Sequence, residues 1–182
     1  MPGEVIDRPN PQPVPSLVPS YVDGLLVKLE KPTLPEETNN ALQKFRRAAN
    51  YIAAAMIFLR DNTYIKRNIT FDDIKPRLLG HWGTCPGLTL VYSHLNLLIQ
   101  KHDLDMLYVV GPGHGAPSIL ANLWLEGSLE RFYPECTRDA KGLNTLVTGF
   151  SATGGFPSHI NAGTPGAIHE GRVKAPSCTY HC

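Results

Sequence analysis

The stretch "DMLYVVGPGHGAPSIL", residues 105–120, places an apolar run directly before a turn that holds three glycines, two prolines and one histidine. The run "MLYVV" predicts a short buried strand, and "PSILANLWLEG", residues 117–127, predicts a helix. A strand, a glycine-rich turn and a helix in this order are typical of an α/β domain, in which helices flank a parallel sheet. Ligands of such sheets bind beyond the carboxyl ends of the strands, and this turn puts His114 there.

Other segments extend this prediction on both sides. A long helix is predicted over residues 33–62, where Thr33 and Glu36 have the spacing of a capping box. Its apolar positions recur every three or four residues and predict a buried face: Leu42, Phe45, Ala49, Ile52, Met56 and Leu59. Shorter helices are predicted over residues 70–80, 86–102 and 141–150, although Pro76 weakens the first. The Gly-, Pro- and Ser-rich residues 151–171 predict a long loop, which is commonly functional or disordered.

Composition excludes several classes of protein. Hydrophobic residues at 42% and charged residues at 18% indicate a soluble globular chain. The net charge of +1 and the absence of a basic stripe argue against a nucleic-acid partner, and the longest apolar stretch, "YIAAAMIFL", is too short to span a membrane. The first 19 residues hold six prolines and no apolar signal core, so we expect an extended arm over residues 1–32 and a cytoplasmic location.

The four cysteines are scattered and form no Cys-x-x-Cys pair: Cys85, Cys136, Cys178 and Cys182. Their even number leaves disulfides open, but without a signal peptide we expect reduced thiols. The terminal "CTYHC" holds three donors that could bind a metal, but such donors in a flexible tail rarely do. We therefore predict no metal ligand in this chain.

Three of the seven histidines lie in separate turns rich in glycine and proline. His81 lies in "GHWGTCPG", His114 in "GPGHGAP" and His159 in "GGFPSHINAGTPG". A single loop histidine is commonly a surface or capping residue, whereas three in such turns favour a ligand site. Imidazoles can exchange protons with substrate hydroxyls and stabilise anionic oxygens. The histidines and their glycine-rich turns therefore predict a polar site that tolerates phosphate. They do not identify a reaction, because the nucleotide, phosphate-loop, esterase and zinc-protease motifs do not occur.

Three motifs in order resemble the N-terminal part of the phosphoketolases: "LLGHWGTCPGLTLVYSHLNLLI", "VVGPGHGAP" and "GGFPSHINAGTPGAIHEG". The resemblance covers residues 25–171, and Cys85 stands where the family has a second threonine. Phosphoketolases are transketolase-like aldehyde-lyases that depend on thiamine diphosphate and magnesium. They use inorganic phosphate to cleave xylulose 5-phosphate or fructose 6-phosphate, which yields acetyl phosphate and an aldose phosphate.

The resemblance implies roles for individual residues and a homodimeric assembly. It implies that His81, His114 and His159 are catalytic. It implies cofactor contacts for Thr84, Gly113 and His114, and contacts with the sugar phosphate for His81, Gly155, Ser158 and His159.

The sequence departs from the family after "IHEG", where it continues as "RVKAPSCTYHC" and Arg172 replaces a cofactor-loop glycine. The magnesium ligands and the glutamate that activates the thiamine ring are not in this chain. We therefore expect an arm at 1–32, part of an incomplete thiamine-diphosphate-binding domain at 33–171 and a divergent, disordered tail at 172–182. Two alternatives stay open beside an active phosphoketolase portion: an inactive truncated remnant that at most pairs with a full-length subunit, or an anion-binding module.

Overall fold

The computed structural model describes residues 34–161, 163–165 and 168–169. The chain divides after Pro35 into two compact units, and the helices and strands given below belong to the second, Glu36–Cys182. The predicted arm over residues 1–32, the predicted cap Thr33 and the tail 172–182 with its "CTYHC" motif lie outside the described residues.

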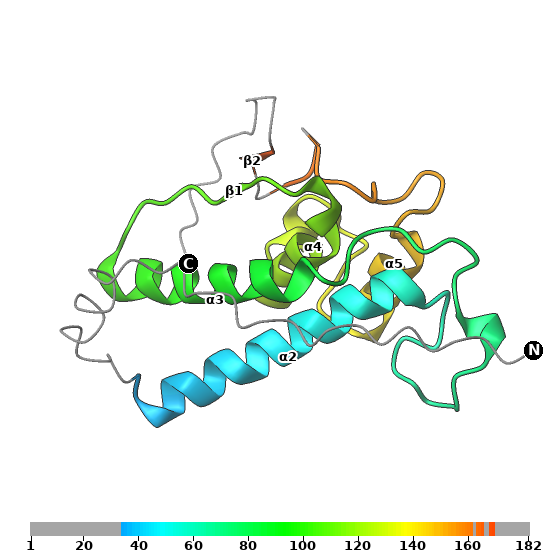
Figure 1. Cartoon of the computed structure of the whole chain (residues 1–182), viewed down its shortest axis with the longest axis horizontal. Coiled ribbons are helices and arrows are strands. Elements are labelled where there is room, and N and C mark those ends of the chain that lie inside the picture. The colour runs from blue at the N-terminus through cyan, green and yellow to red at the C-terminus, as the bar shows by residue number, and fades with distance from the viewer. Residues whose placement is uncertain (1–33, 162, 166–167, 170–182) are drawn as a thin grey trace, which may run out of the picture. The chain divides into compact units, whose positions relative to one another are not determined.

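The described part of the second unit contains four α-helices: α2 (Glu36–Phe58), α3 (Cys85–His102), α4 (Ala116–Glu126) and α5 (Ala140–Gly149). Each lies where a helix is predicted, although α2 begins and ends inside the predicted range of 33–62. Helix α2 is the central element and packs against the other three helices, as Figure 1 shows. Helix α3 has Pro86 in its first turn, and α4 ends at Gly127, whose left-handed φ of 87° suits a residue without a side chain.

The core lies where α2, α4 and α5 meet. Its largest fully buried side chains include Met56 of α2, Ile119, Leu120 and Leu123 of α4, and Leu146 of α5. The predicted apolar face of α2 is therefore confirmed along its C-terminal half. Its first two members, Leu42 and Phe45, are only half-buried and line a groove of about 330 Å³ between α2 and α3.

The helix predicted over residues 70–80 is wrong: this segment contains a single 3-10 turn, Phe71–Asp73, followed by extended chain. Two local interactions explain the difference. The buried carboxylate of Asp73 accepts a hydrogen bond from the amide of Thr70 (2.8 Å), which closes the turn. Lys75 then donates its amide to the carbonyl of Phe58 (2.8 Å), so the segment runs along the end of α2 and cannot coil.

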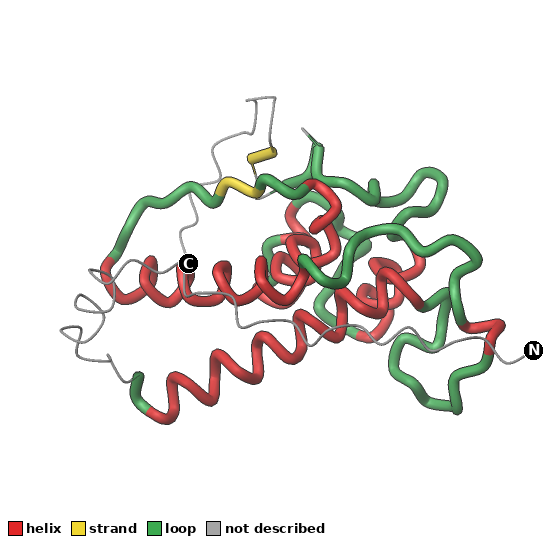
Figure 2. The backbone as a smooth tube through the Cα atoms, viewed as in Figure 1, coloured by secondary structure: helices red, strands yellow, loops and turns green. Residues whose placement is uncertain are grey.

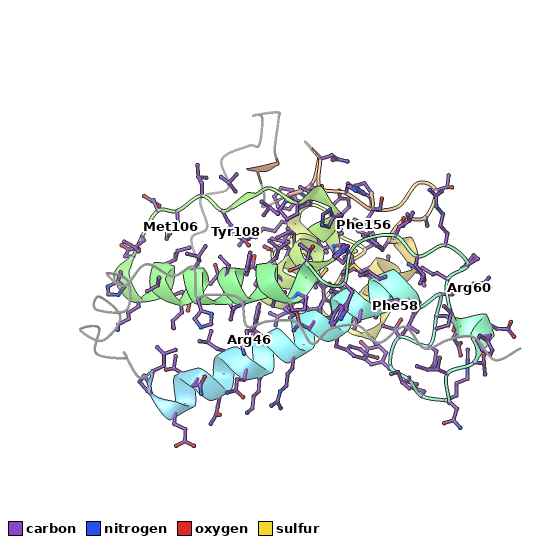
Figure 3. The ribbon with its side chains drawn as sticks, in the orientation of Figure 1. Arg46, Phe58, Arg60, Met106, Tyr108 and Phe156 are labelled. Carbon is purple, nitrogen blue, oxygen red and sulfur yellow. The ribbon has the colours of Figure 1, made fainter. Side chains whose placement is uncertain are left out.

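The predicted strand over residues 106–110 is shorter and more exposed than expected. Only β1 (Val109–Val110) is a strand, and it pairs in parallel with β2 (Ile168–His169), inside the predicted loop 151–171. Leu107 is 73% exposed and only Val110 is buried. Tyr108, labelled in Figure 3, reaches α3, where its hydroxyl donates to the carbonyl of Leu88 (3.3 Å). The described residues are thus mainly helical with one short parallel pair (Figure 2), and the wider sheet of the α/β prediction is not seen among them.

The C-terminal ends of α2 and α5 meet at the ammonium group of Lys75. Its Nζ donates to the carbonyls of Met56 (2.7 Å), Val147 (2.9 Å) and Phe150 (2.9 Å), and it lies 5.5 Å from the centre of the Phe150 ring. Carbonyls in the last turn of a helix have no partner within the helix, and a lysine can satisfy them. Burial lowers the pKa of Lys75 to about 8.

Candidate functional site

Two backbone hydrogen bonds join the three histidine-bearing loops. The amide of His81 donates to the carbonyl of His114 (3.0 Å), which joins the loop before α3 to the loop before α4. The amide of Ile160 donates to the carbonyl of Gly113 (2.8 Å), which brings the loop after α5 to the same place. These two main-chain bonds, together with the parallel pairing of β1 with β2, hold the loops together.

The three predicted catalytic histidines lie side by side. The ring centres of His81 and His114 are 4.9 Å apart, and those of His114 and His159 are 6.3 Å apart. His81 and His159 are exposed, and His114 is half-buried between them. We call these three residues, together with Thr84, the histidine cluster. Their proximity meets a requirement of the predicted roles, which stay predictions.

Thr84 lies between two of the imidazoles. It is the N-terminal cap residue of α3, and its Oγ1 is 3.0 Å from Nδ1 of His81 and 3.0 Å from Nε2 of His114. Its amide is shared between Nδ1 of His81 (3.1 Å) and the carbonyl of His81 (3.2 Å). Thr84, which is predicted to contact the cofactor, therefore has both its hydroxyl and its amide within hydrogen-bond distance of histidine nitrogens.

Two glycines near the cluster leave room for close approach. A Cβ on Gly83 would lie 2.9 Å from Cε1 of His81, and one on Gly115 would lie 2.2 Å from Cδ1 of Leu88. Gly83 therefore lets the imidazole of His81 fold back over its own turn. Gly115 lets the start of α4 approach the first turns of α3.

The remaining predicted site residues lie around His159 and the loop before α4. Ser158 places its Oγ 3.2 Å from Nδ1 of His159, and Gly113 is buried with its carbonyl bonded to Ile160. Gly155 lies against the end of α5, where a Cβ would come within 2.1 Å of the carbonyl oxygen of Gly149. The backbone packing alone therefore accounts for a glycine at position 155.

The N-terminal ends of α3 and α4 both reach the histidine cluster, since Thr84 caps α3 and Gly115 caps α4. The first amides of a helix have no intrahelical partner, and the helix dipole adds partial positive charge there. Neither helix has an acidic residue in its first turn. This end of the unit is therefore suited to an anionic ligand with oxygens that can exchange hydrogen bonds with imidazole.

Other titratable groups lie outside the cluster or are buried beside it. His94 and His102 are on α3, as predicted, and Nδ1 of His94 is 2.8 Å from the carbonyl of Leu90. Cys85 and Cys136 are free, buried thiols, and burial raises the pKa of each to about 11. The thiol of Cys85 donates to the carbonyl of His81 (3.2 Å).

Neither a metal centre nor a membrane span occurs in the part of the chain that the structure describes. There, the His, Cys, Asp and Glu side chains form no group of three or more that could hold an ion. None of the described helices is long and apolar enough to cross a membrane. The groove between α2 and α3 is a separate feature, because no member of the histidine cluster lines it.

Sequence reasoning found the three histidines but missed the link between two of them. The interpretation of Thr84 as a cofactor contact did not include its position between His81 and His114. The signal was present in the spacing, because Thr84 follows His81 by three residues and directly precedes a helix with Pro86 in its first turn. A cap residue at that distance can turn its amide and hydroxyl toward the preceding ring.

Comparison with known proteins gives consistent matches. Residues 33–175 match the XFP N-terminal domain. A probable phosphoketolase of Schizosaccharomyces pombe is 52% identical over 164 residues, which cover 90% of this chain and 20% of that relative. A probable phosphoketolase of Nitrosospira multiformis is 52% identical over 145 residues (80% and 18%), and probable phosphoketolase 2 of Rhizobium meliloti is 54% identical over 130 residues (71% and 17%). The chain thus spans about a fifth of the length of the curated relatives that it matches.

Proposed function

The chain belongs to the phosphoketolase family through its XFP N-terminal domain, and we propose that its histidine cluster is one wall of a site for thiamine diphosphate and a sugar phosphate. The proposed reaction of the whole protein is that of a carbon–carbon lyase. Inorganic phosphate cleaves xylulose 5-phosphate or fructose 6-phosphate, with acetyl phosphate and an aldose phosphate as products. The observation that carries this proposal is the junction of three imidazoles with two helix N-termini.

The donors of the site fit the diphosphate group of the cofactor. The partial positive charge at the starts of α3 and α4 favours phosphoryl oxygens, and no carboxylate in either first turn repels them. Thr84, Gly113 and His114 are the residues that we assign to this contact. Thiamine diphosphate, when bound, supplies the electron sink for cleavage of a carbon–carbon bond. We assign no ligand to magnesium, because the described residues hold no group of acidic side chains that could bind it.

The histidines supply what a sugar phosphate requires. Cleavage of a polyhydroxylated substrate requires proton donors and acceptors at several oxygens, and imidazole serves both roles near neutral pH. His81 and His159 are exposed and are proposed to face the substrate hydroxyls, whereas half-buried His114 lies between them. Ser158 orients His159 through Nδ1, and Gly155 allows the loop that carries them to turn against α5.

The rest of the site is proposed to come from protein beyond these residues. The parallel pairing of β1 with β2 supports a cofactor-binding α/β domain in which this pair is the start of a larger sheet. A homodimer of the whole protein would complete the site. The chain by itself would then be inactive, because an open half-site admits water and weakens each electrostatic interaction. The convergence of two helix N-termini also supports the alternative of an anion-binding module.

The test uses the chain with its histidines labelled with 15N. Millimolar pyrophosphate should shift the imidazole signals of His81, His114 and His159. The signals of His94 and His102, on the same helix as Thr84, should stay in place and serve as controls. Equal shifts at all histidines, or none in the cluster, would contradict the site.

Enzyme assays then separate the remaining possibilities. The chain alone should form no acetyl phosphate from xylulose 5-phosphate, and measurable turnover would contradict a site completed from elsewhere. Copurification with a full-length phosphoketolase would favour a non-catalytic partner over an independent anion-binding module.

A further inference from the structure

One hydroxyl group links the two closest imidazoles of the histidine cluster. Oγ1 of Thr84 is equidistant from Nδ1 of His81 and Nε2 of His114, at 3.0 Å from each. A hydroxyl carries a single proton and can also accept hydrogen bonds. It can therefore donate to only one of the two rings at a time, and its bond with the other ring must run in the opposite direction.

The amide of Thr84 removes the ambiguity at His81. This amide donates to Nδ1 of His81 (3.1 Å), and a backbone N–H has no lone pair with which to accept. Nδ1 of His81 therefore carries no proton, and the neutral ring has its proton on Nε2. A second proton on Nδ1 would face the amide proton of Thr84 and would leave this amide only its bond to the carbonyl of His81 (3.2 Å).

His114 is under no such constraint. When its Nε2 is protonated it donates to Oγ1 of Thr84, and the hydroxyl donates onward to Nδ1 of His81. When its Nε2 is unprotonated it accepts the hydroxyl proton, and His81 retains the amide bond. Both states of His114 keep their hydrogen bonds, so a rotation of the Thr84 hydroxyl accommodates either.

We propose that Thr84 is a positioning residue that places the proton of neutral His81 on Nε2 and joins this ring to Nε2 of His114 through one hydroxyl. The inference deepens the proposed function, on which its catalytic use rests. There, Nε2 of His81 would be a hydrogen-bond donor to substrate oxygen.

Among the described residues around His81 and His114, Thr84 is the group whose hydrogen bonds fix the positions of the imidazole protons. The titratable groups that face them are His159, 6.3 Å from His114 between ring centres, and the thiol of Cys85, which donates to the carbonyl of His81. Within the described residues, no carboxylate is hydrogen-bonded or ion-paired to His81 or His114. No fixed negative charge therefore competes with the Thr84 bonds in setting where the protons lie.

Two-bond and three-bond 15N–1H spectra of the histidine-labelled chain test the proposal directly. In mildly alkaline solution, His81 should show a protonated Nε2 and an unprotonated Nδ1. A proton on Nδ1 of neutral His81 would overturn the proposal.

Variants at position 84 supply the second part of the test. Thr84→Val keeps the shape and the amide, so His81 should keep its proton on Nε2 while the Nε2 signal of His114 loses the shift caused by the hydroxyl. Thr84→Ser should restore that signal, and Thr145→Val, at a half-buried position of α5, should change neither ring. If Thr84→Val leaves His114 unchanged, or Thr84→Ser fails to restore it while His94 and His102 keep their signals, the proposal is wrong.

These spectra need no ligand, so they separate this inference from the proposed function. Failure of pyrophosphate to shift the cluster would leave the assignment of the protons intact. Should Thr84→Val fail to fold, the wild-type spectra and Thr84→Ser still decide the question.

Discussion

Helix N-termini converge at the histidine cluster, whereas helix C-termini converge at Lys75, and the two regions treat a titratable side chain in opposite ways. Lys75 is half-buried and gives three hydrogen bonds to carbonyls of α2, of α5 and of Phe150 directly after α5, so its ammonium has a complete set of partners. The histidines are exposed or half-buried, and two of them share a single hydroxyl. An ammonium with three carbonyl partners holds helix ends together, whereas partly partnered groups that meet solvent keep hydrogen-bonding capacity for a ligand.

The largest effect is expected from removal of the Lys75 ammonium. Lys75→Met keeps much of the side-chain length but leaves three carbonyls without their donor. We expect the free energy of unfolding to fall by about 2–4 kcal/mol, since buried acceptors without partners are costly. Urea denaturation followed by circular dichroism measures it. Lys44→Met, at an exposed position of α2, is the matched control and should change the stability by less than about 0.5 kcal/mol.

If Lys75→Met caused only a small loss of stability, the contrast between the Lys75 region and the histidine cluster would disappear. If Lys75→Met and Lys44→Met lowered the stability equally, water would be satisfying the carbonyls of α2 and α5. Lys75 would then be one more solvated surface charge.

An intermediate effect is expected in the loop that connects the two regions. In Gly155→Ala the new methyl group would meet the carbonyl of Gly149 at the end of α5, and neither backbone can move freely. We expect a loss of about 1–3 kcal/mol, as for other overpacked sites, from the same denaturation curves. Gly87→Ala is the control, because nothing lies within 4 Å of its Cβ and α3 should gain up to about 1 kcal/mol. If the two variants had the same free energy of unfolding, the loop at Gly155 would accommodate the methyl group at little cost.

The smallest effect on stability is expected in the histidine cluster itself. His159 is exposed, and its Nδ1 lies within hydrogen-bond distance of the hydroxyl of the neighbouring Ser158. His159→Ala should therefore change the free energy of unfolding by no more than about 0.5 kcal/mol while it weakens the response to pyrophosphate. Denaturation and the labelled spectra measure the two quantities separately. A loss of stability similar to that of Lys75→Met would instead give His159 a structural role.

The helices could be predicted from the sequence because their signals are local. Apolar residues at helical spacing, Pro86 in a first turn and Gly127 after a last turn each act within a few positions. The segment after Thr70 misled the same reasoning, because its extended form depends on Phe58 and α2. The strand at Val109 was overestimated for a related reason: a strand extends only where a partner chain lies beside it, and the partner here pairs over two residues.

Much of the candidate site could also be predicted, but not its internal bonds. Histidines in three glycine-rich turns indicate a shared place once a fold brings the turns together, and His81, His114 and His159 do meet. Whether a hydroxyl lies between two rings depends on angles that no pattern encodes. Lys75 was missed altogether, because the carbonyls it binds belong to residues 56, 147 and 150, and no local signal marks a lysine that joins segments so far apart.

The thiol of Cys85 gives the histidine cluster a built-in kinetic reporter. The thiol is fully buried and donates to the carbonyl of His81, and its raised pKa leaves almost no reactive thiolate at neutral pH. An alkylating reagent can therefore reach it only when the turn that carries His81 opens. The labelling rate then measures the free energy of that opening, separately from global unfolding followed by circular dichroism.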